Sequence, residues 1–424
     1  MTSKQYRWTL LAICLLAFLA RILFLFIFSL YGQINNSDAA EYSQIAHNLL
    51  AGYGFAFGPG EPTAFRPYGY PFFLAFVYLL GNVGLVHWLQ AIAGSLIILP
   101  AYAIARRFFG AAAAIWSAIG IALHPVLIYL TALLAPEVLA ILAQMMLLWL
   151  AMEIIIDNVR HRQLRALGYV LIGTTAIWLR PELLLVVWFL PAAAWLSRKA
   201  GTRSIYNLLV VTLLATILAL VLPLIRNQLV MQTPSPMPTI GGVTFWGANN
   251  AAANGGWLAP TAEIWPDNDP PLSMRGWPGL TETESQNQFY AASWQWIKAN
   301  PSTALALIPK KLARSWTLSY ADESKTSDLP SWANIANSLM GISVIIGLVI
   351  AWREYRLAFW LLLAPLAAWL AKTIIFYGSA RQTAVALPIF LILAGLTMQR
   401  LLRLLPSILD SFTRIRIPHS PISL

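Results

Sequence analysis

The sequence is poor in charged residues. Only 11% of its 424 residues are Asp, Glu, Lys or Arg, about half the share of a soluble domain, whereas 58% are hydrophobic. A net charge of +11 would favour nucleic-acid binding in a soluble protein, but the basic residues here fall mostly in short gaps between apolar segments. We interpret them as determinants of membrane topology. The sequence therefore predicts an all-α polytopic membrane protein and excludes nucleic acid as a partner.

Cysteine and histidine are scarce. Cys14 is the single cysteine, which excludes intramolecular disulfides and metal sites built from several thiolates. The five histidines are scattered and form no ligand pair at helical spacing, which argues against a histidine-based metal site. The sequence also lacks a Walker A motif, a dinucleotide fingerprint and a nucleophile elbow. An activated substrate should therefore be membrane-borne.

Long apolar runs dominate what remains. Segments of roughly 20 residues can span a bilayer, and they occupy residues 8–31, 86–105, 111–130, 138–156, 208–225, 335–351, 357–375 and 383–398. Two shorter runs within 167–196 are divided by Arg180-Pro181-Glu182. Because proline disfavours continuation of a helix, we predict a helical hairpin there, giving about ten transmembrane helices in total.

The basic residues orient these spans. Ten spans place six basic clusters on one side: Lys4/Arg7, Arg106/Arg107, Arg160/Arg162/Arg165, Arg198/Lys199/Arg203, Arg353/Arg356 and Arg400/Arg403. By the positive-inside rule that side is the cytoplasm, so both termini should be cytoplasmic in a multi-pass protein of the cell inner (plasma) membrane. We expect one transmembrane domain over residues 1–400 with outer loops 32–85 and 226–334, then a cytoplasmic tail over 401–424. Residues 72–80 and 304–316, with Lys310, Lys311 and Arg314 on a polar face, are predicted to be interfacial helices.

Carboxylates gather on the predicted outer side. Asp38, Glu41, Glu137 and Glu182 lie at span ends or in loops, where desolvation is costly unless each charge is paired. We therefore expect a polar cleft with basic partners. Asp38 and Glu41 would share one face of a helix that starts there, and either is a candidate general base. The alternative is helix capping by Ser37 or Asp38 with Glu41 in the first turn.

Five outer-side cations break the positive-inside pattern: Arg66, Arg180, Arg226, Lys372 and Arg381. Guanidinium groups bind phosphate bidentately and stabilise the charge that grows on a phosphate as it leaves. Snorkelling to lipid headgroups, or pairing with the carboxylates, is the alternative for each one. Arg21, inside the first span, is either a functional residue or a buried partner of a carboxylate such as Glu137.

The second outer loop is rich in glycine, asparagine and tryptophan. Gly241, Gly242, Trp246, Asn249 and Asn250 lie close together, with further tryptophans downstream. This composition is typical of a sugar-binding surface, where aromatic faces stack on pyranose rings and amides bind hydroxyls. Anchoring in the membrane interface is the alternative for any single tryptophan.

Six short motifs then occur in a recognisable order. They are residues 38–42 with 52–55, Arg66-Pro67-Tyr68-Gly69-Tyr70-Pro71, residues 105–110 with Ala135-Pro136-Glu137, Leu179-Arg180-Pro181-Glu182, Ile225-Arg226-Asn227 with Gly241-Gly242 and Asn249-Asn250, and Tyr377-Gly378-Ser379-Ala380-Arg381. In this order the sequence resembles the GT-C class of polyprenyl-phosphate-dependent glycosyltransferases. The resemblance is to bacterial family 39 members related to protein O-mannosyltransferases and aminoarabinose transferases. Ala39 stands where that family often has a second acidic residue.

The resemblance implies a GT-C fold and an inverting transfer of a monosaccharide from a polyprenyl-phosphate donor to a glycan, lipid or protein acceptor on the outer face. It implies Asp38 as the base, with Glu41 as the second catalytic candidate. The predicted donor-phosphate ligands are Arg66, Arg180, Arg226, Arg381 and Tyr377. The predicted substrate-binding residues are Tyr42, Tyr70, Glu137, Glu182, Trp246, Asn249 and Asn250. No metal or other cofactor is required, since arginines can neutralise phosphate, and a divalent ion at Asp38 and Glu41 is left open.

Two other classes compete with this interpretation. A transporter or flippase of lipid-linked saccharides should carry polar groups near the bilayer midplane on broken helices, and often repeated halves. The sequence shows no repeat, and apart from Arg21 its candidate site residues cluster on the outer side. An O-antigen ligase or polymerase shares the large outer loop but fits the ordered motifs less well.

Overall fold

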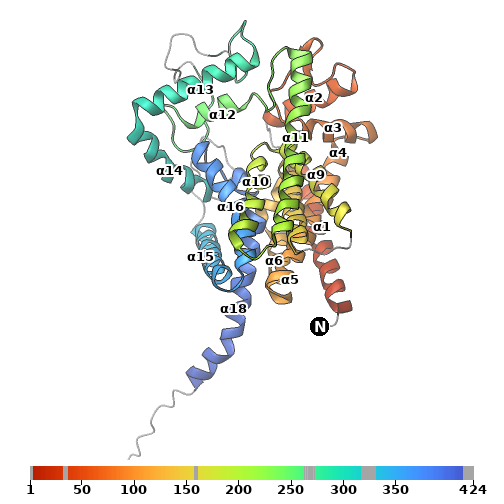
Figure 1. The fold of residues 1–424 in the computed structure, drawn as a ribbon, viewed down its shortest axis with the longest axis vertical. Helices are drawn as coiled ribbons and strands as arrows, with labels where there is room; N and C mark the ends of the chain where they lie inside the picture. Colours follow the sequence, from red (N-terminus) through yellow and green to blue (C-terminus); the bar gives the residue numbers. More distant parts are fainter. Residues whose placement is uncertain are drawn as a thin grey trace, which may run out of the picture.

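The structure, a computed structural model, describes residues 3–31, 37–156, 161–261, 263, 265, 271, 273–316 and 331–413. Its regular elements are helices apart from one short antiparallel hairpin, formed by β1 (Ala56–Gly58) and β2 (Glu61–Pro62) (Figure 1). The predicted all-α class is confirmed for the part of the chain that the structure describes.

Seven helical segments are long and apolar enough to cross a membrane within these described residues. They lie in α1 (Ser3–Tyr31), α4 (Val83–Leu96) joined to α5 (Ile98–Phe108), α8 (Glu137–Ile155), α11 (Thr202–Met231), α15 (Ser331–Glu354), α16 (Arg356–Ile375) and α18 (Leu387–Thr413). An eighth consists of α6 (Ala111–Leu123) followed, after a bend of 51°, by α7 (Pro125–Tyr129) and η1 (Leu130–Ala132). These helices confirm a multi-pass membrane protein.

The predicted hairpin is formed by α9 (Arg162–Leu179) and α10 (Leu183–Ser197), which meet at Arg180-Pro181-Glu182. Neither passes the same test of length and hydropathy: α10 has 15 residues, and α9 begins with Arg162 and Arg165. Every segment predicted to span is thus helical, while length and composition alone support eight of the ten.

The bend in the eighth span explains why a charged residue, Arg21, is buried within the first span. The side chain has no exposed surface and donates from Nη1 to the carbonyl of Ala122, at 3.2 Å, and from Nη2 to that of Ile121, at 3.5 Å. Pro125 lacks the amide hydrogen that would otherwise satisfy the Ile121 carbonyl. Arg21 therefore caps a broken helix. The pairing with Glu137 considered from the sequence is not present, because Glu137 binds other arginines.

The remaining elements gather at one end of the helix bundle. They are α2 (Ser37–Leu50), the β-hairpin, α3 (Gly69–Leu80), α12 (Gly241–Ala248), α13 (Glu282–Ala299), α14 (Pro301–Trp316) and α17 (Ala380–Thr383). Figure 1 shows α2 and α12–α14 at the upper end, with the start of α1 and the far end of α18 below. Both predicted interfacial segments, 72–80 and 304–316, are helical, each within a helix that begins three residues earlier.

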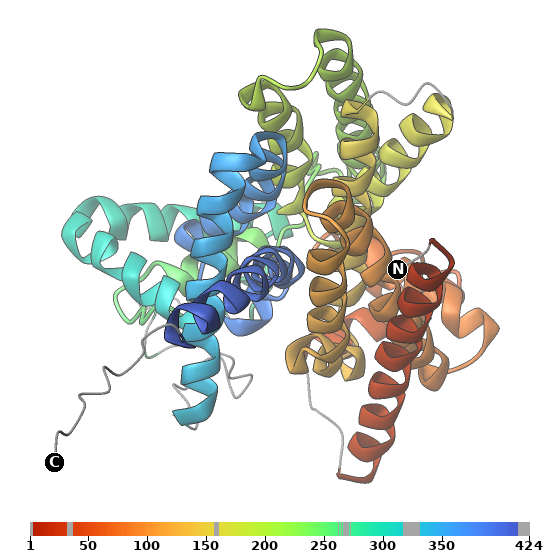
Figure 2. The same cartoon turned by 90° about the horizontal axis from the view of Figure 1, so that it is seen from below.

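The helices pack closely at small residues. Figure 2 shows the N-terminal helices on one side and the C-terminal ones on the other, and α18 packs against both α6 and α15. At these contacts a Cβ atom on Gly395 would clash with Ser117, and one on Gly347 with the Leu393 backbone. Glycine permits this approach, which maximises van der Waals contact between helices in lipid.

The second outer loop is anchored by a buried lysine. Lys311 of α14 is 2% exposed and donates from Nζ to Asn249 Oδ1, at 2.8 Å, and to the Ile374 carbonyl, at 3.1 Å. Lys311 was predicted to lie on the polar face of an interfacial helix, and the structure shows this part of the face buried against other helices. Burial lowers the pKa of Lys311 to about 8. The contact ties α12, α14 and the end of α16 together.

Gly378 lies in the same junction and supports a stability test. Its amide donates to the Gly255 carbonyl, at 3.0 Å, and a Cβ atom would overlap the Lys311 carbonyl oxygen. We expect Gly378→Ala to lower the free energy of unfolding by about 2 kcal/mol, because backbone atoms cannot swing aside as a side chain can. Thermal unfolding in detergent measures this. Gly201→Ala is the control, since its Cβ atom meets nothing within 4 Å; equal shifts for both variants would contradict the packing described.

Candidate active site

Asp38, in the first turn of α2, and Glu41, three residues further along the helix, both bind one arginine. Arg66 donates from Nη2 to Asp38 Oδ1, at 2.7 Å, and from Nε to Glu41 Oε2, at 2.6 Å. The second oxygen of Asp38, Oδ2, accepts from Arg381 Nη1, also at 2.7 Å. The prediction that Asp38 and Glu41 share a helix face is confirmed. Capping alone does not account for these side-chain contacts.

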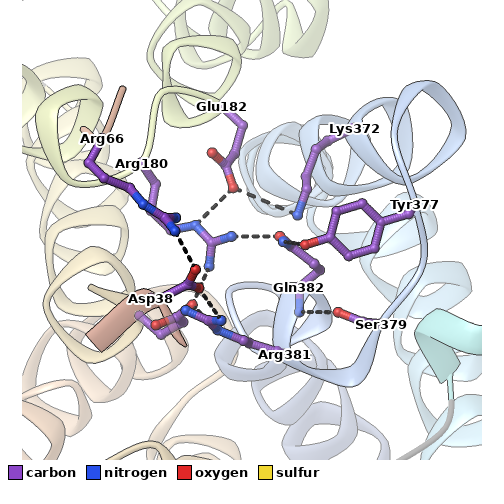
Figure 3. Close-up of polar contacts among 10 residues, drawn as sticks. Asp38, Arg66, Arg180, Glu182, Lys372, Tyr377, Ser379, Arg381 and Gln382 are labelled. Atoms are coloured by element: carbon purple, nitrogen blue, oxygen red, sulfur yellow. Dashed lines mark hydrogen bonds and ion pairs between the residues drawn. The ribbon is translucent and has the colours of Figure 1, made fainter. Parts of the chain in front are cut away.

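These pairs belong to a longer chain of ion pairs (Figure 3). Arg381 Nε binds Glu137 Oε1 at 2.6 Å, and the same oxygen accepts from Arg180 Nη1 at 3.3 Å. Arg180 Nε binds Glu182 Oε1 at 2.8 Å, and Lys372 Nζ lies 3.7 Å from that oxygen. In order, the connected side chains are Glu41, Arg66, Asp38, Arg381, Glu137, Arg180, Glu182 and Lys372. The charges alternate in sign along the whole of this chain.

Helix ends supply nearly every member of this ion-pair chain. Glu137 is the first residue of α8, Arg180 and Glu182 form the turn between α9 and α10, and Lys372 lies in the last turn of α16. Arg381 lies in α17, between the last two long helices. The converging carboxylates and basic partners expected from the sequence are therefore present at one end of the bundle.

Exposure varies along the chain of ion pairs. The Glu137 side chain is 2% exposed and that of Arg66 5%, whereas Asp38 is 24%, Glu41 22% and Arg381 19% exposed. A buried charge is costly unless it is paired, and the buried Arg66, Glu137 and Arg180 each have two partners of opposite charge. Asp38, Glu41 and Arg381 form the open edge of the site, and Glu182, near the other end of the chain of ion pairs, is also 22% exposed.

The two arginines control the charge of Asp38. Burial disfavours its ionised form, but the charges of Arg381 and Arg66 and their hydrogen bonds outweigh burial and lower its pKa to about 2. Asp38 is consequently a carboxylate at any physiological pH. While both arginines hold it, it is a weak base, because a proton would have to replace two strong ionic hydrogen bonds.

Arg66 is positioned by the second outer loop. Glu282 of α13 accepts from Thr63 Oγ1, at 2.5 Å, and from the Ala64 amide, at 2.9 Å. Arg226 donates from Nη1 to the Thr63 carbonyl and from Nη2 to the Phe55 carbonyl, both at 2.6 Å. Arg226 therefore lies apart from the chain of ion pairs. Its role as a phosphate ligand stays a prediction, and these contacts favour a structural role.

Two further site residues surround Arg180. Arg180 Nη2 donates to Gln382 Oε1 at 2.5 Å, and Gln382 Nε2 donates to the Tyr377 hydroxyl at 2.8 Å. Tyr377 thus reaches the site through Gln382. Sequence reasoning missed Gln382, although a polar residue directly after Arg381 was a signal. Lys372 was one of the five outer-side cations identified in the sequence, but it was not predicted to be a site residue.

Tyr42 and Tyr70 lie beneath the ion pairs. The Arg66 guanidinium lies 5.3 Å from the centre of the Tyr42 ring, which meets the Tyr70 ring edge-on at 5.2 Å. The Tyr70 hydroxyl donates to Gln90 Oε1 at 2.9 Å. Both tyrosines are buried, so the observed contacts are supporting ones, and the predicted contact with substrate remains untested.

The proposed sugar-binding residues of the second loop are also buried. Trp246 is 1% exposed and packs against Trp265 with ring centres 5.0 Å apart. The Asn249 amide donates to the Phe245 and Ile375 carbonyls, and the Asn250 amide donates to the Trp246 carbonyl. None of the three predicted residues lies on an open surface. Their substrate-binding role stays a prediction without support from this geometry.

A metal was left open at Asp38 and Glu41. Among the residues that the structure describes, no group of three His, Cys, Asp or Glu side chains could hold a metal ion. Both Asp38 oxygens already accept hydrogen bonds from guanidinium groups. As arranged here, these residues do not fit a divalent ion.

The fold is similar to that of a solved membrane oligosaccharyltransferase, in keeping with the GT-C resemblance of the sequence. The archaeal oligosaccharyltransferase AglB from Archaeoglobus fulgidus, in complex with an inhibitory peptide and a dolichol-phosphate, matches 99% of this chain with a TM-score of 0.56 and 13% identity. An Archaeoglobus fulgidus oligosaccharyltransferase in the apo form matches with a TM-score of 0.55 and 14% identity. This chain spans about half the length of those proteins, 53% in each case.

ArnT from Cupriavidus metallidurans bound to undecaprenyl phosphate also matches 99% of this chain, at 15% identity, and 82% of its own. Its TM-score of 0.39 is too low to support an argument. No protein-family model and no curated protein matches the sequence.

Glu137 provides a test of the chain of ion pairs. Glu137→Gln removes the anion shared by Arg180 and Arg381. We expect it to lower the free energy of unfolding by about 3 kcal/mol, the low end of the cost of breaking a buried ion pair, because each arginine keeps a second carboxylate. Thermal unfolding in detergent is the measurement. Glu153→Gln is the matched control, because its pair with Arg165 is more exposed and is worth about 0–1 kcal/mol. A Glu137→Gln loss no larger than the control would contradict the buried ion-pair chain.

Proposed function

We propose that the protein is an inverting glycosyltransferase that moves a monosaccharide from a polyprenyl-phosphate donor to an acceptor. The observation that carries the proposal is Asp38, a partly open carboxylate held between Arg66 and Arg381. A carboxylate can accept the proton that the attacking nucleophile loses. The neighbouring guanidinium groups can stabilise the negative charge that develops on the departing phosphate. The GT-C fold is consistent with both roles.

The donor class rests on the arginines and on the resemblance. AglB has been solved with dolichol-phosphate, and here Arg381 supplies a guanidinium at the open edge of the site. Guanidinium groups suit phosphate because they offer parallel N–H donors and a permanent charge. A lipid donor would enter from the surrounding bilayer, and the acceptor class, whether glycan, lipid or protein, is left open.

The chemistry assigns one role to each group. An Asp38 oxygen takes the proton from the acceptor's nucleophilic atom, and that atom attacks the anomeric carbon from the face opposite the phosphate. The bond between the anomeric carbon and the phosphate oxygen breaks, and its electron pair stays on the phosphate. Arginine stabilises the resulting charge. The sugar is transferred with inversion, and polyprenyl phosphate is released.

The orientation in the membrane belongs to the same proposal. Arg106 and Arg107 lie in the last turn of α5, and Arg353 lies in the last turn of α15. Because α16 begins at Arg356, its last turn, with Lys372, lies at the other end of the bundle. Glu137, the first residue of α8, belongs to the same chain of ion pairs as Lys372. The positive-inside rule then assigns the basic ends to the cytoplasm. The site accordingly opens on the outer face of the inner membrane, with both termini cytoplasmic. Residues 1–400 form the transferase domain and 401–424 the tail, of which 414–424 lie outside the described residues.

The test is release of free polyprenyl phosphate by the purified protein in nanodiscs, with undecaprenyl-phosphate monosaccharides as donors. We expect Asp38→Asn to reduce release by about 10²–10⁴-fold, the usual contribution of a general base. Folding should persist, because Arg66 keeps Glu41 and Arg381 keeps Glu137 as partners. Glu284→Gln, on an exposed turn of α13, is the control and should retain full activity.

Two results would contradict this function. Full activity of Asp38→Asn would show that Asp38 is not the general base. No release with any donor, together with movement of the intact lipid-linked sugar across a liposome bilayer, would favour the transporter class.

A further inference from the structure

The charges of the site balance without any substrate. Asp38, Glu41, Glu137 and Glu182 carry four negative charges, and Arg66, Arg180, Lys372 and Arg381 carry four positive ones, all within one connected chain. A phosphate that enters the site must therefore form an ion pair with a basic side chain that already has a carboxylate partner. Adding an anion to a balanced, partly buried site is costly unless a bond is exchanged.

Arg381 is the cation whose bond can be exchanged most readily. It is the most exposed of the four basic side chains, at 19% against 5–8% for the others. It also divides its donors, with Nη1 on the partly open Asp38 and Nε on the buried Glu137. Glu137 can hold the side chain in place while Nη1 changes partner.

Arg66 is less suited to an exchange. Its Nε and Nη2 bind Glu41 and Asp38, which lie three residues apart on one face of α2, and its guanidinium lies against the Tyr42 and Phe65 rings. The preceding backbone is fixed by Glu282. Arg66 therefore stays with Asp38 whether or not a phosphate is bound.

We propose that Arg381 is a shared positioning residue, exchanged at Nη1 between Asp38 and the donor phosphate, so that donor binding releases Asp38 to act as the base. This inference rests on the proposed function and names the step that couples donor binding to acceptor activation. Donor binding removes one of the two cations that stabilise the Asp38 carboxylate. Its affinity for a proton rises at that moment, and not before.

The charge changes during transfer follow the same exchange. A polyprenyl-phosphate sugar is a phosphodiester with one negative charge, and the released polyprenyl phosphate carries up to two. The proton lost by the acceptor neutralises Asp38 in the same step. The total charge of the site is thus unchanged, and Arg381, which moved to the phosphate when the donor bound, already contacts the group that gains charge.

The exchange predicts that removing the competing carboxylate strengthens phosphate binding. The probe is undecaprenyl phosphate, titrated into the full chain in nanodiscs. We expect Asp38→Asn to bind it at least fivefold more tightly than wild type, because Arg381 then has one partner fewer. Damage to the fold would lower the affinity for undecaprenyl phosphate, so a higher affinity cannot result from such damage. Asp38→Ala tests the same point should Asp38→Asn fail to fold.

Two variants make the experiment specific. Glu41→Gln is the matched control, since Glu41 lies on the same turn with nearly the same exposure but pairs with Arg66, and we expect an affinity within twofold of wild type. Arg381→Gln should weaken binding about tenfold and should abolish the gain from Asp38→Asn in the double variant.

The possible outcomes separate this inference from the function beneath it. No binding of undecaprenyl phosphate by the wild type would overturn the donor class, and the exchange with it. Binding by the wild type, with no gain in Asp38→Asn or with a gain that persists without Arg381, would overturn the exchange and leave the transferase proposal standing.

Discussion

The bond between Glu137 and its two arginines is the constraint on which the rest of the site depends. A carboxylate that is almost fully buried at the start of α8 requires positive partners, and Arg180 and Arg381 supply them from parts of the chain far apart in sequence. The α9–α10 turn, α17 and α8 are thereby held at one point. The outer members, Asp38 and Glu41, are then positioned through Arg381 and Arg66.

This arrangement gives the site a buried centre and a more exposed edge. The buried centre, around Glu137 and Arg180, is fixed by ionic contacts and by Gln382. At the open edge, Arg66 and Arg381 keep Asp38 charged and weakly basic. A rigid interior with an exchangeable edge suits an enzyme that must hold a leaving group before it activates a nucleophile.

The sequence predicted the fold and the acidic half of the site well, because both follow from rules of local chemistry. Apolar length gave the spans, and the cost of a lone carboxylate at a membrane boundary indicated that Asp38, Glu41, Glu137 and Glu182 would find basic partners. It could not assign those partners, which depend on tertiary contacts. Arg226 looked equivalent to Arg381 in sequence, yet it binds backbone carbonyls.

Burial was the other quantity that the sequence did not contain. Trp246, Asn249 and Asn250 have the composition of a sugar-binding surface, but they pack inside the second outer loop, and Lys311 from an apparently amphipathic helix is buried with them.

The most direct test of the account is a cryo-EM structure in nanodiscs with undecaprenyl phosphate bound. The account predicts a phosphate oxygen within hydrogen-bond distance of Arg381 Nη1, Asp38 no longer bound to that atom, and Glu137 still on Nε. A phosphate held elsewhere, with the pair between Asp38 and Arg381 intact, would contradict it.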